Sequence, residues 1–150
     1  MSRKEGVATI MDELKARKVK IGRHFSEVLN QGNVEAIEEI YWPEYVLHAP
    51  IGTGDTVGYA GLRQRVVEFR TGFPDIQFTV ESIIMEGDDA SARWTLRGTH
   101  EGDFVGLAPT GRKVVVPGIL MVRFAEGRII EGWSGFDALD MMQQLGVFPR

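Results

Sequence analysis

The feature of this sequence that most constrains its fold is a change of hydrophobic period near residue 75. Upstream of it, most apolar residues recur every three or four positions, which is typical of amphipathic helices. The segment "GFPD" (72–75) carries helix-ending residues. From "IQFTV" (76–80) onward, apolar and polar residues alternate, which is typical of strands with one buried face. Helices followed by a run of strands predict an α+β fold and not alternating βαβ units.

Turn signals between these runs indicate where the elements begin and end. The first helix is expected to bury an apolar stripe that starts at Ile10. Gly32 suits the left-handed position after a helix, and Asn33 is suited to cap the next one. "GDD" (87–89) and "AEG" (125–127) are hairpin turns. We therefore expect helices over about 8–29, 34–40, 59–71 and 138–145, a short strand over 45–48, and antiparallel strands between 76 and 134.

The simplest assembly of these elements is a curved antiparallel sheet wrapped around the N-terminal helices. Such a sheet is apolar on the face that the helices cover and can be wet on the other. Strong curvature leaves a concave pocket between sheet and helices, and such a pocket is the first place to expect a small-molecule site.

Length and composition limit the class of protein. The 150 residues suit a single domain with one core. The absence of cysteine excludes disulfides, thiol nucleophiles and thiolate metal sites. The three histidines lack the spacing of metal ligands, so we expect no metal site. No apolar run follows "MSRK" (1–4), and the run at 114–122 is too short to span a bilayer, so we expect no signal peptide, no membrane partner and a cytoplasmic protein.

Charge is unevenly distributed along the chain. The net charge is −4, yet residues 1–23 carry seven basic and three acidic side chains. A basic N-terminal helix can contact an anionic partner or can simply present a solvated face. The sequence contains no pattern typical of a nucleic-acid-binding module, so we expect no nucleic-acid partner.

The segment "GWSGFDALDMMQQLG" (132–146) joins a strand pattern to a helix pattern, and Asp137 lies at the junction. Asp137 and Asp140 have the spacing of a helix N-cap with an acidic residue in the first turn. A capping carboxylate accepts backbone N–H bonds, which lower its pKa and oppose a role as general base. Asp137 is therefore either a cap or, as a catalytic candidate, an acid/base residue at the mouth of the pocket.

Two histidines are further candidates. His48 ends a short strand ahead of a glycine-rich loop, where it is either a hydrogen-bonded rim residue or a general base with a near-neutral pKa. His100 shares strand parity with Trp94, which places both on one face of a regular strand and makes His100 a substrate-binding candidate at the rim. Trp133 and Ser134 are neighbours on a strand, so only one of them can face the pocket.

Four segments resemble one family in their order and spacing. They are "FPDIQFTVESIIMEGD" (73–88), "WTLRGTHEGDFVGLAPTGRKV" (94–114), "VRFAEGRIIEGW" (122–133) and "FDALDMMQQLG" (136–146). The chain from about residue 20 onward resembles the SnoaL-like polyketide cyclases, also called ester cyclases, of the NTF2-like superfamily. The resemblance implies one NTF2-like cone over residues 1–150, with a hydrophobic pocket and often a homodimer formed through the sheet.

The resemblance also implies a chemistry and a set of site residues. The cyclases perform an intramolecular aldol condensation in which a pocket carboxylate moves the proton and no cofactor is required. Aligned with their C-terminal segment, Ser134 stands where the cyclases carry the catalytic Asp. Leu120 and Leu29 stand where they carry a pocket His and, in some members, a pocket Tyr. The alignment places Ser134 and not Trp133 in the pocket.

Two functions remain open at this stage. The first is a cofactor-free cyclase or isomerase-type lyase acting on a small hydrophobic, carbonyl-containing metabolite, with His48 and Asp137 as the acid/base pair and Ser134 as a hydrogen-bond donor. Trp94, His100, Leu120 and Leu29 would bind its substrate. The second is a catalytically silent protein that binds an apolar ligand, which the Ser at position 134 favours. An epoxide hydrolase or dehydratase would need a buried Asp–Arg–Asp cluster; Arg93 and Arg97 lie on one face of a strand, but that face is expected to be the polar one.

Overall fold

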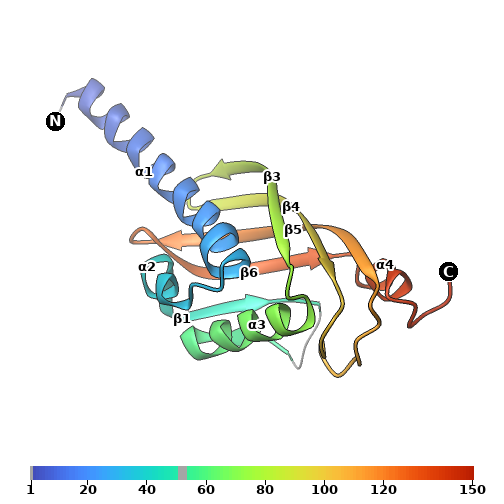
Figure 1. Cartoon of the computed structure of the whole chain (residues 1–150). Coiled ribbons are helices and arrows are strands. Elements are labelled where there is room, and N and C mark those ends of the chain that lie inside the picture. Colours follow the sequence, from blue (N-terminus) through green and yellow to red (C-terminus); the bar gives the residue numbers. More distant parts are fainter. Residues whose placement is uncertain (1, 51–53) are drawn as a thin grey trace.

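The computed structural model describes residues 2–50 and 54–150. Within these residues, six strands form one mixed sheet in the order β2-β1-β6-β5-β4-β3, curved and unclosed, with helices against one face (Figure 1). The predicted α+β class with a curved sheet is confirmed. The strands are β1 (Tyr41–His48), β2 (Thr56–Val57), β3 (Gln77–Glu86), β4 (Asp89–Thr99), β5 (Lys113–Ala125) and β6 (Arg128–Phe136). The helices are α1 (Arg3–Arg23), the π-helical η1 (His24–Asn30), the 3₁₀ turn η2 (Val34–Ala36), α2 (Ile37–Ile40), α3 (Gly58–Gly72) and α4 (Ala138–Gln144).

One strand pairing differs from the antiparallel arrangement expected from the sequence. β1 lies parallel to β6, with Leu47 opposite Gly132 and His48 opposite Trp133. Hairpin turns impose antiparallel pairing on β3 with β4 and on β5 with β6, and β4 and β5 are also antiparallel. β1 and β6 are far apart in the chain, so no turn dictates their direction. The predicted strand 45–48 also begins earlier, at Tyr41, and Pro43 falls where the β1–β6 register shifts, a position that tolerates a missing N–H.

The first helix starts earlier than predicted and is only partly packed. Ser2 and Glu5 form a reciprocal capping box that starts α1 at Arg3. The N-terminal half of α1 projects beyond the sheet (Figure 1), so Ile10 is 58% exposed instead of buried. Burial begins at Ile21 and continues through η1, whose Asn30 side chain hydrogen-bonds both the N–H (2.7 Å) and the carbonyl (2.9 Å) of Phe78 in β3.

The turn after η1 forms differently from the expectation. Gly32 has the predicted left-handed conformation, with φ of 72°. Asn33 makes no capping hydrogen bond, and the following segment is a 3₁₀ turn leading into the four-residue α2. The predicted cap is therefore wrong: Asn33 precedes a 3₁₀ turn, whose start does not offer the N–H groups of an α-helix to its side chain.

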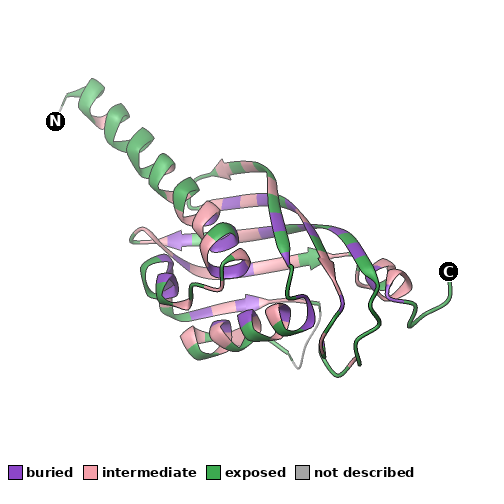
Figure 2. Cartoon of the chain, in the orientation of Figure 1, coloured by how far each residue is buried: buried purple, intermediate pink, exposed green. Residues whose placement is uncertain are grey.

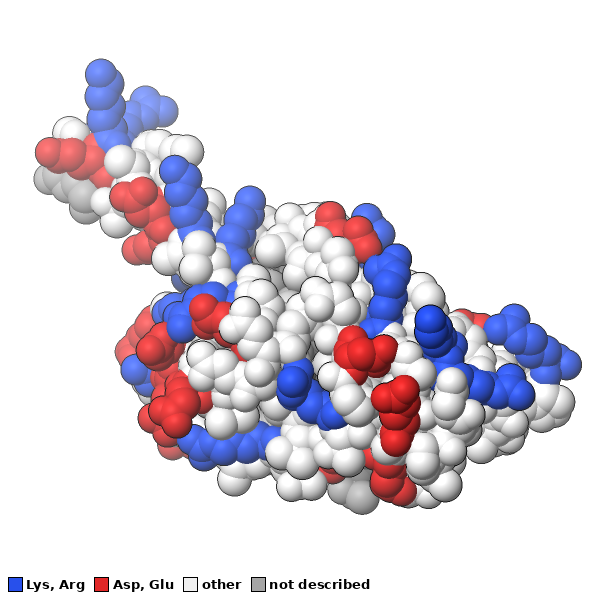
Figure 3. Space-filling model, viewed as in Figure 1, with Lys and Arg blue, Asp and Glu red and all other residues white. Residues whose placement is uncertain are grey.

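The basic charge of the N-terminal segment is shared between solvent and the body of the protein. Basic and acidic side chains both occur along the projecting part of α1 (Figure 3). Arg17 forms a salt bridge of 3.2 Å with Asp88 in the β3–β4 turn, and Lys20 donates to the carbonyl of Gly127 in the β5–β6 turn. These contacts fasten α1 to the sheet and so hold η1 against it. None of the helices in the described part of the chain is long and apolar enough to cross a membrane.

Buried and exposed residues alternate along the strands of the sheet (Figure 2). Along β5, Val114, Val116 and Leu120 are buried on the inner face, which the helices cover. Val115 and Ile119 alternate with them and are exposed on the outer face. Period-two alternation in the sequence therefore becomes one apolar inner face and one outer face that contacts solvent.

Candidate functional site

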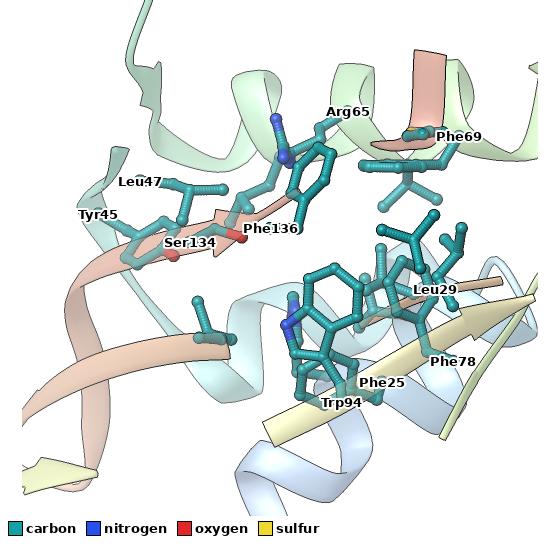
Figure 4. Close-up of a pocket in the computed structure, with 18 residues that line it drawn as sticks. Phe25, Leu29, Tyr45, Leu47, Arg65, Phe69, Phe78, Trp94, Ser134 and Phe136 are labelled. Carbon is teal, nitrogen blue, oxygen red and sulfur yellow. The ribbon is translucent and has the colours of Figure 1, made fainter. Parts of the chain in front are cut away.

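A cavity of about 690 Å³, including its open mouth, lies between the inner face of the sheet and the helices. Side chains from η1, β1, α3, β3, β4, β5, β6 and α4 line it, and most of them are aliphatic or aromatic (Figure 4). Convergence of so many elements on one apolar space makes this cavity the candidate site for a small molecule.

An aromatic cluster forms one wall of the cavity. The rings of Phe78 and Trp94 meet edge to face at a centroid distance of 5.2 Å, with Phe25 5.8 Å from Phe78 and Phe136 6.0 Å from Trp94. Gly118 in β5 makes room for this wall, because a Cβ there would lie 2.2 Å from the Trp94 ring. Walls built of aromatic rings suit a flat, apolar ligand.

Two hydroxyl groups interrupt the apolar lining on the side of β1 and β6. Tyr45 and Ser134 both line the cavity and are visible together in Figure 4. The Tyr45 hydroxyl lies over Gly132, where a Cβ would approach it to 2.4 Å. Burial raises the pKa of Tyr45, so its hydroxyl stays protonated and can donate a hydrogen bond.

A buried histidine forms another polar part of the lining. His24 in η1 shares a hydrogen bond between its Nδ1 and the hydroxyl of Tyr41 in β1. Burial, and to a lesser extent the charge of Arg65, lower the pKa of His24 to about 3. His24 is therefore a neutral imidazole at physiological pH, able to form hydrogen bonds but a weak proton acceptor.

Arg65 brings a cation to the same cavity. It extends from α3 into the lining, and its guanidinium lies 5.2 Å from the centroid of the Phe69 ring (Figure 4). Burial lowers the pKa of Arg65, while Tyr45, Glu68 and Tyr41 act in the opposite direction. An arginine remains charged despite such a shift, so the cavity holds a positive charge in apolar surroundings.

Four of the residues predicted from the sequence line this cavity: Ser134, Trp94, Leu120 and Leu29. Ser134 faces inward while its neighbour Trp133 packs on the outer face beside His48, as strand alternation requires. Their contact with a ligand stays a prediction.

His48 lies on the opposite face of the sheet. Its strand neighbour Leu47 lines the cavity, whereas the His48 ring stacks on Trp133 at 5.7 Å. Nε2 lies 2.8 Å from Glu131 and Nδ1 lies 3.0 Å from Asp55. Hydrogen bonds to these two carboxylates raise the pKa of His48. The structure thus brings His48 together with two acids but not with Ser134 or Asp137, and its catalytic role stays a prediction.

Asp137 is a helix cap, as one of the two interpretations of the sequence expects. Its Oδ1 accepts the backbone N–H of Asp140 at 2.9 Å, at the start of α4. Asp137 is exposed and is not among the residues that line the cavity. The acid/base role, the other interpretation, stays a prediction.

His100 lies deeper than the rim position expected from the sequence. It is fully buried beside Phe73, at 5.4 Å between ring centroids, and its Nδ1 lies 3.1 Å from the Thr110 hydroxyl. It follows β4 at the point where the chain turns away, so it is not among the cavity-lining residues although Trp94 and Leu96 are.

Sequence reasoning missed three polar residues of the lining: His24, Tyr45 and Arg65. For Arg65 a signal was available, because Leu62, Val66 and Phe69 form the buried stripe of α3 and a residue three after Leu62 lies on the same face. For Tyr45 a signal was also available, because it lies two residues before Leu47 on the same strand and therefore on the same face of the sheet. For His24 a signal was also available, because it lies three residues after Ile21 and four before Val28, on the buried face of a regular helix.

The lining residues of the described cavity include no Asp or Glu. Within residues 2–50 and 54–150, no group of three or more His, Cys, Asp or Glu side chains is arranged to hold a metal ion. The site therefore offers hydrogen-bond donors, one imidazole and one guanidinium.

Comparison with known proteins places this arrangement in a family. The chain is 27% identical over 119 residues to the nogalonic acid methyl ester cyclase of Streptomyces nogalater, covering 78% of this chain and 88% of that protein. It is 27% identical over 131 residues to the aklanonic acid methyl ester cyclase AcmA of Streptomyces galilaeus, covering 83% and 87%. A crystal structure of a proposed polyketide cyclase from Acidithiobacillus ferrooxidans matches with a TM-score of 0.78 and 30% identity, covering 88% of this chain and 95% of that chain.

The family model itself covers every element that lines the cavity. The model of the SnoaL-like polyketide cyclases matches residues 20–145, from the last turn of α1 to the end of α4. The resemblance inferred from the sequence is thereby confirmed, and the chain belongs to the SnoaL-like polyketide cyclase family.

Proposed function

We propose that this protein binds a flat, hydrophobic, carbonyl-bearing metabolite of polyketide type in the cavity and closes a ring in it without a cofactor. The observation that carries this proposal is the cavity itself, whose aromatic wall lies opposite a few hydrogen-bond donors. Two cyclases of methyl esters among the relatives support the class of substrate.

The reaction is an intramolecular aldol addition. A base removes a proton from a carbon between two carbonyls, the resulting enolate carbon bonds to another carbonyl carbon, and the new alkoxide takes up the proton. Hydroxyl donors that face the carbonyl oxygen stabilise the alkoxide as it forms. Ser134 and Tyr45 supply such donors from adjacent strands.

The proton-transfer residues are proposed from the sequence. His48 and Asp137 are the acid/base pair of that hypothesis, with Ser134 as donor. Both lie outside the cavity lining, and His48 lies on the opposite face of the sheet, so their action requires the substrate to extend past the cavity and around the sheet. The His48→Ala/Asp137→Ala double variant tests this role: full turnover in the variant would contradict it.

A second candidate function is binding without turnover. It is favoured by one specific observation, which is that the lining residues of the described cavity include no carboxylate. A serine hydroxyl at position 134 cannot replace a carboxylate as base without a helper. The same cavity would then hold an apolar ligand unchanged.

The experiment that separates these functions uses the two named methyl esters as probes. Nogalonic and aklanonic acid methyl esters are incubated with the protein, binding is measured by calorimetry, and chromatography with mass detection looks for a ring-closed isomer of equal mass. Leu120→Trp fills the cavity, and Ile119→Trp on the outer face is its matched control.

Each result has a defined meaning. An isomer formed by the wild type and by Ile119→Trp, but not by Leu120→Trp, supports the cyclase. Binding with the same dependence on position 120 but without an isomer supports the silent binding protein. Binding that survives Leu120→Trp would show that the ligand lies elsewhere and would overturn the proposal.

We also propose a homodimer formed through the outer face of the sheet. Ile84, Val115 and Ile119 are apolar and at least half exposed on that face. Apolar residues gathered on one face of a sheet are suited to contact a second copy. Sedimentation equilibrium tests this: Ile119→Glu should convert a dimer into a monomer, and a wild-type monomer would contradict the proposal.

A further inference from the structure

Arg65 is the one lining residue of the described cavity that carries a full positive charge. It occupies a helix position whose neighbours on the same face, Leu62 and Phe69, are buried and line the same space. Arg65 itself is half-buried, and a charge without a partner at such a position is unusual, because charged side chains are rarely withdrawn from water unless they are paired.

No described residue pairs with this guanidinium. Two other half-buried arginines do have partners: Arg23 forms salt bridges with Glu27 (2.7 Å) and Glu39 (2.6 Å), and Arg70 donates to the carbonyls of Leu29 and Asn30. Arg65 forms neither a salt bridge nor a hydrogen bond with another residue in the described ranges. Its guanidinium packs over the Phe69 ring, at 5.2 Å from the ring centroid.

Such an arrangement costs free energy in the empty protein. A charge that is partly withdrawn from water without a partner is destabilising, and the cost is relieved by an opposite charge with hydrogen bonds to it. The cavity lining supplies no carboxylate for this purpose. The partner must therefore come with the ligand or from solvent, and a ligand that fills the cavity displaces the solvent.

We propose that Arg65 binds an anionic oxygen group of the ligand, so that the ligand of this cavity is a flat hydrophobic acid. The inference rests on the proposed function, because it places the ligand in the cavity. A planar guanidinium donates two parallel N–H bonds to a carboxylate, and it can equally bind the oxygens of an ionised enol. The Tyr45 hydroxyl, which lines the same cavity, offers a further donor.

The proposal also gives Arg65 a place in ring closure. The enolate formed when the substrate loses its proton carries negative charge on its oxygens. A fixed guanidinium in a cavity that excludes water stabilises this charge more than it stabilises the neutral ketone. Recognition of an acidic ligand and stabilisation of the enolate thus use the same interaction.

The test compares acids with neutral analogues of the same shape. One pair is anthraquinone-2-carboxylate and its methyl ester, and the other is 2-hydroxy-1,4-naphthoquinone, an acidic enol, and its methyl ether. Calorimetry gives Kd for the wild type, Arg65→Met, Arg65→Gln and Arg65→Lys. Arg63→Met is the matched control, because Arg63 lies on the same helix but pairs with Glu38 at the surface.

We expect the wild type and Arg63→Met to bind at least one acid about 10-fold or more tighter than its neutral partner, as charge-assisted hydrogen bonds provide. Arg65→Met and Arg65→Gln should lose this preference while keeping their affinity for the neutral partner, and Arg65→Lys should keep part of it. Preference in the first pair alone identifies a carboxylate, and preference in the second pair alone identifies an enolate.

The opposing results are distinguishable. Equal affinity of the wild type for acid and neutral partner in both pairs would overturn the role of Arg65 and leave the proposed function standing. Failure of all four probes to bind would contradict the proposed function and the inference together. A melting curve of each variant checks that it is folded. If Arg65→Met does not fold, Arg65→Gln replaces it in the comparison.

Discussion

The inner and outer faces of the sheet treat their polar groups in opposite ways. On the outer face, His48 lies between Asp55 and Glu131, and Arg123 pairs with Asp89 at 3.0 Å. On the inner face, Arg65 has no charged partner among the described residues. These outer-face charges are paired with protein groups, whereas the inner-face charge is not. The unpaired cation of the inner face is what the predictions for a ligand in the cavity rest on.

Two histidines on opposite faces of the sheet, His24 and His48, differ in their pKa. His24 is buried and hydrogen-bonded to Tyr41, and burial lowers its pKa to about 3. His48 is partly exposed, and its hydrogen bonds to Glu131 and Asp55 raise its pKa. One residue type is therefore neutral on one face and readily protonated on the other. If the two faces differ in this way, substitutions on the inner face should have larger effects than matched substitutions on the outer face.

The largest expected effect comes from Gly118→Ala. The new Cβ would lie 2.2 Å from the Trp94 ring, which must then move out of the aromatic wall. We expect a loss of about 3 kcal/mol in the free energy of unfolding, the upper end for overpacking a core. Urea unfolding measures it. Gly135→Ala is the control, because nothing lies within 4 Å of a Cβ at Gly135, and similar losses in both variants would contradict the contrast.

The second prediction concerns the missing carboxylate. Ser134→Asp places an acid in the lining, where burial raises its pKa and suits it to proton transfer. We expect ring closure of the methyl ester probes to accelerate about 100-fold, at the low end of the range for general acid–base catalysis. Ser134→Asn, of the same shape without the acid, is the control. Equal rates in the two variants would show that this position is not where the substrate loses its proton.

The third prediction tests the buried hydrogen bond of His24. Tyr41→Phe removes the hydroxyl and leaves Nδ1 buried without a partner, which costs about 2 kcal/mol. Thr95→Val on the outer face also removes a hydrogen bond, to Glu81 at 2.8 Å, but water replaces it there. Thermal unfolding should therefore show a clear fall in Tm for Tyr41→Phe and almost none for Thr95→Val. A comparable fall in Tm for both variants would show that the inner and outer faces do not differ in the cost of a lost hydrogen bond.

The sequence predicts the fold of this protein better than it predicts the residues of the candidate site. The change of period near residue 75 predicts helices followed by strands, and hairpin turns such as 87–89 predict which strands pair. The same alternation predicts that Ser134 faces inward. These features depend on residues close together in the chain, so a short stretch of sequence is enough to predict them.

Contacts between distant segments are what the sequence could not give. The parallel pairing of β1 with β6 joins residues more than eighty positions apart, and it decides that His48 lies beside Glu131 on the outer face. His24 shares the buried helix face of Ile21 and Val28, but its hydrogen bond to Tyr41 of β1 joins segments that no short window contains. Arg65 was recognisable as a charge on an apolar stripe, but its lack of a partner could be seen only in three dimensions.

The smallest expected effect is the pH dependence that His48 contributes. Its pKa is raised above the ordinary value of 6.5, so the folded protein holds the proton more tightly than the unfolded chain. This stabilisation is complete below pH 6.5 and disappears as the pH rises through the raised pKa. The Tm difference between wild type and His48→Gln should therefore be largest in mild acid and vanish in mild base.

His24 gives the opposite slope and so completes the comparison. Its pKa is lowered to about 3 in the folded protein. Between pH 6.5 and pH 3, the histidine is therefore protonated in the unfolded chain but neutral in the folded protein, so acid destabilises the fold. His24→Gln should remove part of the fall in Tm at acid pH, whereas His48→Gln should steepen it. If both variants changed the pH profile in the same direction, the two faces would not differ in the way the geometry requires.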